Sequence, residues 1–234
     1  MINKQFISSI YNYCDRWCDR CSMTDSCRLF ADEKEQQLTD EEQDIRNTAF
    51  WNRISENFSE AMIKLEEMSS EMGINLDDLP PAPPRIVPEI HKELINQATQ
   101  YGIEVNKWLN ELFDYFEESL KLNGENRQVL FDSVIDFCEV LRWYSMQIGV
   151  KISRASRRDE DEEESTYTYD QNGSAKVAIL GLERSIVAFT EILKKIPQYE
   201  DPILVFLAKL AIIKQEVNHL FPGAASFKRP GFDV

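Results

Sequence analysis

Residues 112–134 read LFDYFEESLKLNGENRQVLFDSV, and the centre of this stretch, Asn123-Gly124, is a strong signal for a chain reversal. On each side of it, large apolar side chains recur every three or four residues, the spacing of a helix that buries one face. These side chains are Ile90, Leu94, Tyr101, Val105, Trp108, Leu112, Phe116 and Leu120 before the turn, and Leu130, Val134, Phe137, Leu141, Tyr144 and Ile148 after it. The pattern predicts helices over about 88–122 and 126–153 that form an antiparallel hairpin.

A further helix is expected before this hairpin. Thr39 and Glu42 form a capping box, in which the threonine oxygen and the glutamate carboxylate each bond the other residue's backbone amide. The apolar period continues from there to Met72, and Gly73 is a typical residue for a C-terminal stop. We therefore predict one long helix over 39–72.

Two more helices are expected at the C-terminal end. Ser174 is the expected N-cap of a helix over 174–196. Residues 203–220 follow Asp201-Pro202 and are apolar on most sides, which is typical of a central helix. No strand pattern of useful length is visible. We predict an all-α fold, a bundle of about five long helices with an N-terminal four-cysteine segment.

Two segments interrupt the helical patterns. Residues 74–88 contain five prolines, which oppose regular helix and favour an extended spacer. Residues 154–173 include six consecutive acids, Asp159–Glu164, whose mutual repulsion predicts a mobile loop. We expect a cysteine-rich metal-binding segment over 1–38 and a helical bundle over 39–234, with these two segments as its linker and its acidic loop.

Four of the five cysteines, Cys14, Cys18, Cys21 and Cys27, follow the pattern C-x3-C-x2-C-x5-C. Thiolates are soft ligands, and four of them close a zinc site or hold an iron–sulfur cluster. In an unbroken helix Cys14 and Cys21 would lie about 10 Å apart, whereas two sulfurs on one zinc lie only about 4 Å apart. Either the helix breaks inside the motif or the cysteines surround a larger object, and the second alternative favours an iron–sulfur cluster over zinc.

The residues around the cysteines also fit a metal site. Arg16 and Arg20 can offset the negative charge of four thiolates and donate hydrogen bonds to sulfur, although an ordinary surface charge network is the alternative. The C-x2-C-x5-C part, from Cys18 to Cys27, resembles the auxiliary-cluster motif of some radical-SAM enzymes, and this resemblance implies a cluster. It covers ten residues, and the fourth cysteine precedes the group instead of following it. Structural zinc and unmetallated or disulfide-linked cysteines stay open as alternatives.

Net charge and hydropathy restrict the classes of partner that we expect this protein to bind. The 234 residues carry a formal net charge of −15, and 43% of them are hydrophobic. So acidic a surface repels phosphate backbones and anionic lipids, so we expect no nucleic-acid and no membrane partner. No secretory signal or membrane-length apolar run is visible, which predicts a cytoplasmic protein, where clustered cysteines favour metal over disulfides. Cys138 stands alone on a predicted helix and is expected in the core.

Other chemical motifs are sparse. Glu216 and His219 form an E-x-x-H motif that resembles part of the ligand set of ferritin-like di-iron bundles. Glu183 or Glu191 could add a carboxylate, but the second E-x-x-H of such bundles is missing. With two histidines and no phosphate-binding glycine motif, neither a catalytic triad nor a nucleotide site is readable.

These observations predict a cytoplasmic metal-binding helical protein. Its four-cysteine site, with an iron–sulfur cluster favoured over zinc, would serve redox or electron transfer, sensing, or assembly with a protein partner. One alternative is an interaction or scaffold protein with a structural zinc. A second is a carboxylate-bridged metalloenzyme in the bundle core. The sequence does not fix a reaction or an oligomeric state.

Overall fold

The computed structural model describes residues 6–35, 39–79, 86–158 and 164–233, and most of them are helical. The elements are the 3-10 helices η1 (Ile10–Tyr13), η2 (Cys18–Arg20), η3 (Thr24–Ser26), η4 (Leu76–Asp78) and η5 (Pro197–Tyr199), and the α-helices α1 (Arg28–Glu35), α2 (Asp40–Gln43), α3 (Thr48–Met72), α4 (Glu89–Ala155), α5 (Glu164–Lys195) and α6 (Glu200–Leu220). The all-α prediction is confirmed, and the described ranges hold no strand beyond one bridge between Ile86 and Arg158. The prolines at 80–84 and the acids at 159–163 lie outside these ranges.

The chain divides into two compact units, and each is described by itself. Unit 1 comprises Met1–Phe6 and Thr24–Pro83, and unit 2 comprises Ile7–Met23 and Pro84–Val234. This division differs from the single boundary that we expected at residue 38. As a result, Cys14, Cys18 and Cys21 belong to unit 2, whereas Cys27 belongs to unit 1.

Unit 1 contains the helix predicted for 39–72, but as two helices. The capping box is present at α2, where Glu42 accepts the Thr39 amide at 2.9 Å and the Thr39 hydroxyl accepts the Glu42 amide at 3.3 Å. The helix then breaks, because the side chains of Asp44 and Asn47 accept backbone amides and compete with helical hydrogen bonding. Gly73 ends α3 with a φ of 68°, as expected.

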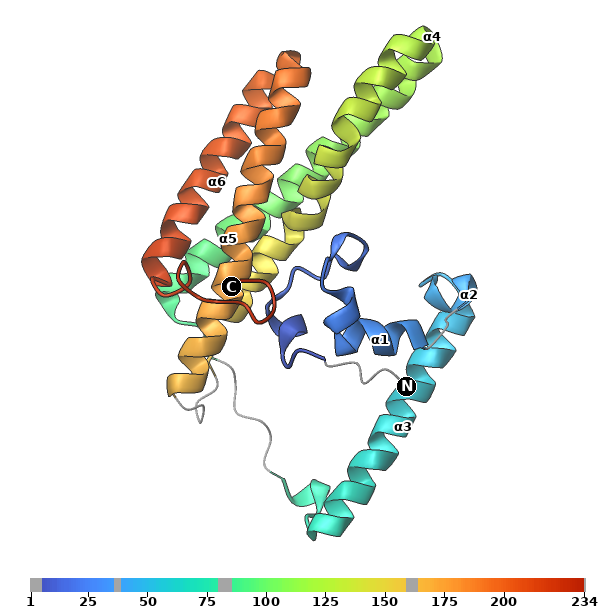
Figure 1. Cartoon of the computed structure of the whole chain (residues 1–234), viewed down its shortest axis with the longest axis vertical. Helices are drawn as coiled ribbons and strands as arrows, with labels where there is room; N and C mark the ends of the chain where they lie inside the picture. Colours follow the sequence, from blue (N-terminus) through green and yellow to red (C-terminus); the bar gives the residue numbers. More distant parts are fainter. Residues whose placement is uncertain (1–5, 36–38, 80–85, 159–163, 234) are drawn as a thin grey trace. The chain divides into compact units, whose positions relative to one another are not determined.

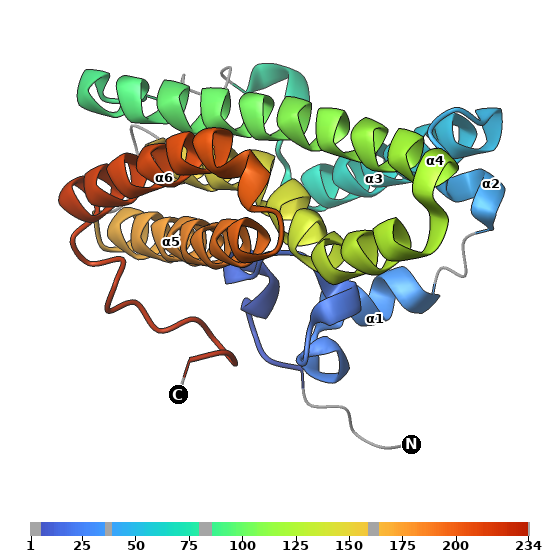
Figure 2. The same ribbon diagram turned by 90° about the horizontal axis from the view of Figure 1, so that it is seen from above.

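Unit 2 is organised by α4, which folds back on itself. The Asn106 side chain donates to the Ser145 hydroxyl at 2.8 Å, although 39 residues separate them. In a straight helix that separation would span about 58 Å. The two arms of α4 therefore run antiparallel, as Figures 1 and 2 show, and the predicted hairpin is confirmed.

Helices α5 and α6 pack along this hairpin and complete an apolar core (Figure 2). Helix α5 begins at Glu164, so residues 164–173 of the expected loop are helical. Ser174, the expected N-cap, is instead fully buried inside α5. Its capping signal is local and was outweighed by the apolar face that α5 buries. Helix α6 is not central: it buries one face and leaves Leu204, Val205 and Ile212 exposed.

The close approach of the two α4 arms yields a first prediction. A β-carbon at Gly102 would lie 2.3 Å from the Ser145 carbonyl oxygen, a backbone atom that cannot rotate away. Gly102→Ala gains about 1 kcal/mol of helix propensity but incurs an overpacking cost of roughly 1–3 kcal/mol. We expect a lower melting temperature by circular dichroism. Ile103→Ala, a neighbouring exposed position, is the control, and an unchanged or raised melting temperature for Gly102→Ala would contradict this packing.

Candidate functional site

The cysteine segment of unit 2 is built from tight turns. Helix η1 ends at Tyr13, and η2 begins at Cys18, so no continuous helix runs through the motif. Between them Arg16 has a φ of 58°, the left-handed conformation that few residues other than glycine adopt. Of the two geometric alternatives that the spacing left open, the helix break is the one observed. The spread along a helix, our reason for favouring a cluster over zinc, is therefore removed.

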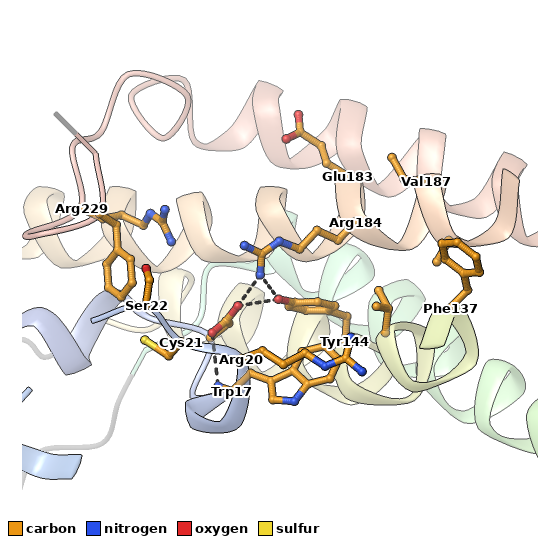
Figure 3. A pocket seen from close by; sticks show the side chains of 14 residues that line it. Trp17, Arg20, Cys21, Ser22, Phe137, Tyr144, Glu183, Arg184, Val187 and Arg229 are labelled. Atoms are coloured by element: carbon orange, nitrogen blue, oxygen red, sulfur yellow. Dashed lines mark hydrogen bonds and ion pairs between the residues drawn. The ribbon is translucent and has the colours of Figure 1, made fainter. Parts of the chain in front are cut away.

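Asp15 anchors this segment on the helices of unit 2. Its carboxylate accepts the Tyr144 hydroxyl at 2.5 Å, the Trp17 amide at 3.2 Å and the Arg184 guanidinium. Arg184 also donates to the Tyr144 hydroxyl, so the three side chains form a closed network (Figure 3). The backbone carbonyl of Asp15 accepts two more donors, Trp143 at 3.0 Å and Gln147.

This network determines the charge of Asp15. Burial opposes ionisation, but the hydrogen bonds from Tyr144 and Trp17 and the charge of Arg184 outweigh it and hold the pKa of Asp15 below its ordinary value. Burial, together with the Asp15 carboxylate, raises the pKa of Tyr144. Tyr144 therefore stays a neutral donor and Asp15 a carboxylate at neutral pH.

Aromatic contacts support the same docking. The Trp17 ring stacks on Trp143 with 5.0 Å between ring centroids. At the other end of the segment, the buried Tyr13 packs edge-on against Tyr169 and Phe227, and its hydroxyl donates to Asp170 at 3.2 Å. The segment therefore packs on α4, on α5 and on the C-terminal tail.

Cys14, Cys18 and Cys21 of unit 2 are half-buried, and none of them is in a disulfide bond within the described residues. The Met23 amide donates to the Cys21 sulfur at 3.4 Å, and the Arg16 amide donates to the Cys14 sulfur. Burial raises the pKa of Cys14, and the Arg16 amide and the positive charges of Lys151 and Arg16 oppose that rise. Lys151 comes from α4, where it is only 8% exposed. The positive charge of Lys151 beside Cys14 could not be predicted from the sequence, because the two residues lie far apart in the chain.

The other predicted residues lie as follows. Cys27 is in unit 1, where its amide bonds the Thr24 carbonyl just before α1. Arg20 stacks on the Trp17 ring and pairs with Asp136 and Glu139, so its sulfur-directed role stays a prediction. Cys138 is buried as expected, and burial raises its pKa to about 12.

The structure brings no metal-ligand set together: in the described part of the chain, no three His, Cys, Asp or Glu side chains form a group that could hold a metal ion. The four-cysteine site therefore stays a prediction. At the end of α6, Glu216 is half-buried and His219 is exposed, whereas the core of unit 2 is lined by apolar side chains. Glu183 pairs with Lys214, and Glu191 pairs with Lys194.

A pocket of about 530 Å³ lies between the docked segment and the helices of unit 2 (Figure 3). Asp15, Trp17 and Cys21 line it from the segment, and Tyr144 and Arg184 line it from the helices. This pocket has no signal in the sequence, because its walls meet only through contacts between residues more than a hundred positions apart.

No known family model, curated protein or solved structure matches this chain. Of the helices that the structure describes, none combines the length and the apolar character needed to cross a bilayer.

The Asp15 network yields a second prediction. Asp15→Asn removes the charge that Tyr144 and Arg184 bind, and hydrogen bonds to a charged group are typically worth about 1.5–3 kcal/mol. We expect the segment to undock, so that near-ultraviolet circular dichroism loses the signal of the Trp17–Trp143 stack. Asp19→Asn changes an exposed aspartate of the same segment and should leave this circular dichroism signal unchanged.

The same network predicts a pH dependence. Because the folded pKa of Asp15 is depressed, its contribution to docking is complete above its unfolded value, about 3.9, and is lost as the pH falls through the folded value. Acid titration of wild-type protein should therefore release the tryptophan signal below about pH 4. A wild-type profile identical to that of Asp15→Asn would show that Asp15 does not hold the segment.

Proposed function

We propose that this is a metal-binding protein whose thiolates serve redox or electron transfer, sensing or partner assembly. Cys14, Cys18 and Cys21 would supply three ligands, and the sequence spacing offers Cys27 as the fourth. The observation that most supports this proposal is the pair of backbone amides that donate to cysteine sulfurs. In each case the amide two residues later points at the cysteine, Arg16 to Cys14 and Met23 to Cys21.

Amide donors to sulfur are typical of the surroundings of metal-bound thiolates, and thiolate is the form that binds metal. Without metal, burial raises the pKa of the Cys14 thiol, which donates to the Tyr11 carbonyl at 3.4 Å, so metal binding would release its proton. At Cys14 the geometry requires the left-handed backbone of Arg16, and such conformations concentrate at functional sites. Lys151 adds a buried positive charge beside Cys14. Cys14, Cys18 and Cys21 do not form a ligand set among the described residues, so a bound ion would have to draw them together.

An iron–sulfur cluster stays our first prediction for the bound group, now only because the Cys18–Cys27 spacing resembles an auxiliary-cluster motif, and zinc is the alternative. Both take four thiolates, but only a cluster carries charge-transfer absorption and electrons. A redox function therefore requires the cluster, whereas zinc would limit the site to structure or assembly.

The third prediction tests this proposal. Protein purified without air should contain iron or zinc in a fixed ratio, with visible absorption if a cluster is present. Each of Cys14→Ser, Cys18→Ser, Cys21→Ser and Cys27→Ser should lower the metal content, because serine is a poor ligand for soft metals. Cys138→Ser is the matched control and should keep it. Metal content that is absent, or equal in all five variants, would refute the proposal.

A second candidate function is protein interaction through α3. This helix has no buried residue, yet its large apolar side chains repeat every three and four positions. The heptad positions a and d are Trp51, Ile54, Phe58, Ala61, Leu65, Met68 and Met72, all exposed. A sustained heptad repeat favours a coiled coil.

The partner that we propose for α3 is a second copy of the chain. In a parallel pair, Lys64 at one g position would face Ser69 of the other copy, and Asn57 would face Met62, so no like charges oppose each other. Self-association through this seam would cover the exposed a and d side chains.

The fourth prediction follows from the heptad. Sedimentation analysis should find a dimer that Phe58→Glu converts to a monomer, because the charge would enter the apolar seam. Ile63→Glu places the same charge on another exposed position of α3, outside the seam, and should stay dimeric. A monomeric wild-type protein, or equal effects of the two variants, would exclude the coiled coil.

A further inference from the structure

The pocket of unit 2 has two chemically different ends. Figure 3 shows Phe137 and Val187 at one end, and Arg229, Ser22 and Cys21 at the other. Its volume of about 530 Å³ falls within the range of small-molecule sites, roughly 300–1,000 Å³. An occupant that matches both ends would be amphipathic.

Three arginines line this pocket on a protein whose net charge is −15, together with two carboxylates, Asp15 and Glu183. Asp15 pairs with Arg184, Glu183 pairs with Lys214 and Asp233 pairs with Arg229, so the charge available to a ligand comes mainly from Arg20. Each guanidinium lies over an aromatic ring that also lines the pocket. The pairs are Arg20 over Trp17 at 4.5 Å, Arg184 over Tyr144 at 5.5 Å and Arg229 over Phe232 at 4.8 Å to the ring centroid. Stacking of this kind fixes the guanidinium plane and limits the entropy lost when a ligand binds.

These arginines keep donors for a ligand. Arginine has five N–H groups, and the hydrogen bonds found among the described residues use only Nη2 of Arg20, Nη1 of Arg184, and Nε and Nη2 of Arg229. The side chains of Arg20 and Arg184 are 41% and 50% exposed, so neither is sealed inside the protein.

The carboxylates paired with Arg20 do not cancel its charge inside the pocket. Asp136 and Glu139 are more exposed than Arg20, at 77% and 51% of their side-chain surface, and neither lines the pocket. Water and salt screen charges that are this exposed. The guanidinium of Arg20, held on the Trp17 ring, therefore still presents positive charge to an occupant.

We propose that this pocket binds a small amphipathic organic anion. Its carboxylate or phosphate would pair with the arginines that line the pocket, because guanidinium groups match both anions with paired hydrogen bonds. Its planar apolar body would lie against Phe137 and Val187. The proposal does not require the metal, although Cys21 would place any bound centre beside the occupant.

The fifth prediction is tested by calorimetric titration of the full chain with 1-naphthoate, 1-naphthyl phosphate, neutral 1-naphthalenemethanol and inorganic phosphate. Both naphthyl anions should bind. The neutral alcohol lacks the negative charge and inorganic phosphate lacks the apolar rings, so each should bind at least about tenfold more weakly. The order of the two naphthyl anions distinguishes a carboxylate ligand from a phosphate ligand.

Two matched pairs of variants locate the binding. Val187→Glu adds a negative charge at an exposed pocket position and should lower the affinity for the naphthyl anions by about tenfold or more. Val150→Glu, at a similarly exposed position outside the pocket, should leave that affinity unchanged. Arg20→Gln should weaken them, whereas Arg142→Gln, which removes an arginine stacked on Phe113 outside the pocket, should not.

The result that would overturn the proposal is equally definite. Neutral and anionic naphthyl probes that bind alike, wild-type affinity in Val187→Glu, or no binding of either anion would each do so. Circular dichroism checks that every variant folds. All four cysteines stay in place, so metal content measured on the same samples separates this proposal from the metal proposal.

Discussion

The charge of Asp15 is the constraint on which the candidate site depends. A half-buried carboxylate is costly unless donors surround it, and this one has three, from Tyr144, Trp17 and Arg184. Its backbone carbonyl receives two more. One residue of a turn is thereby held on both α4 and α5, and the cysteines on either side of it are positioned with it.

The same anchor creates the pocket. Because Asp15 brings the segment onto Tyr144 and Arg184, the Trp17 ring stacks on Trp143 and forms one wall beside Cys21. The proposed thiolate centre and the proposed anion site are therefore neighbours that share one support. A ligand in this pocket would lie next to any redox or structural metal at Cys21, and such proximity is what a sensing function requires.

Local rules predicted much of the fold. The chain reversal inside α4, the capping box at Thr39 and the stop at Gly73 all depend on neighbouring residues, and all three are present, although residues 123 and 124 are themselves helical. Ser174 shows the limit of such rules, since a capping residue inside a buried helix face has no effect. The site was less predictable: Asp15 meets Tyr144 and Arg184 across 129 and 169 residues, and no local spacing signals that contact.

The central claim is that the docked cysteines bind metal through sulfur. X-ray absorption at the iron and zinc edges, on full-length protein purified without air, tests it most directly. The account predicts a first coordination shell of sulfur, with zinc–sulfur distances near 2.3 Å if the metal is zinc. A shell of nitrogen and oxygen alone, or protein that carries neither metal, would contradict it.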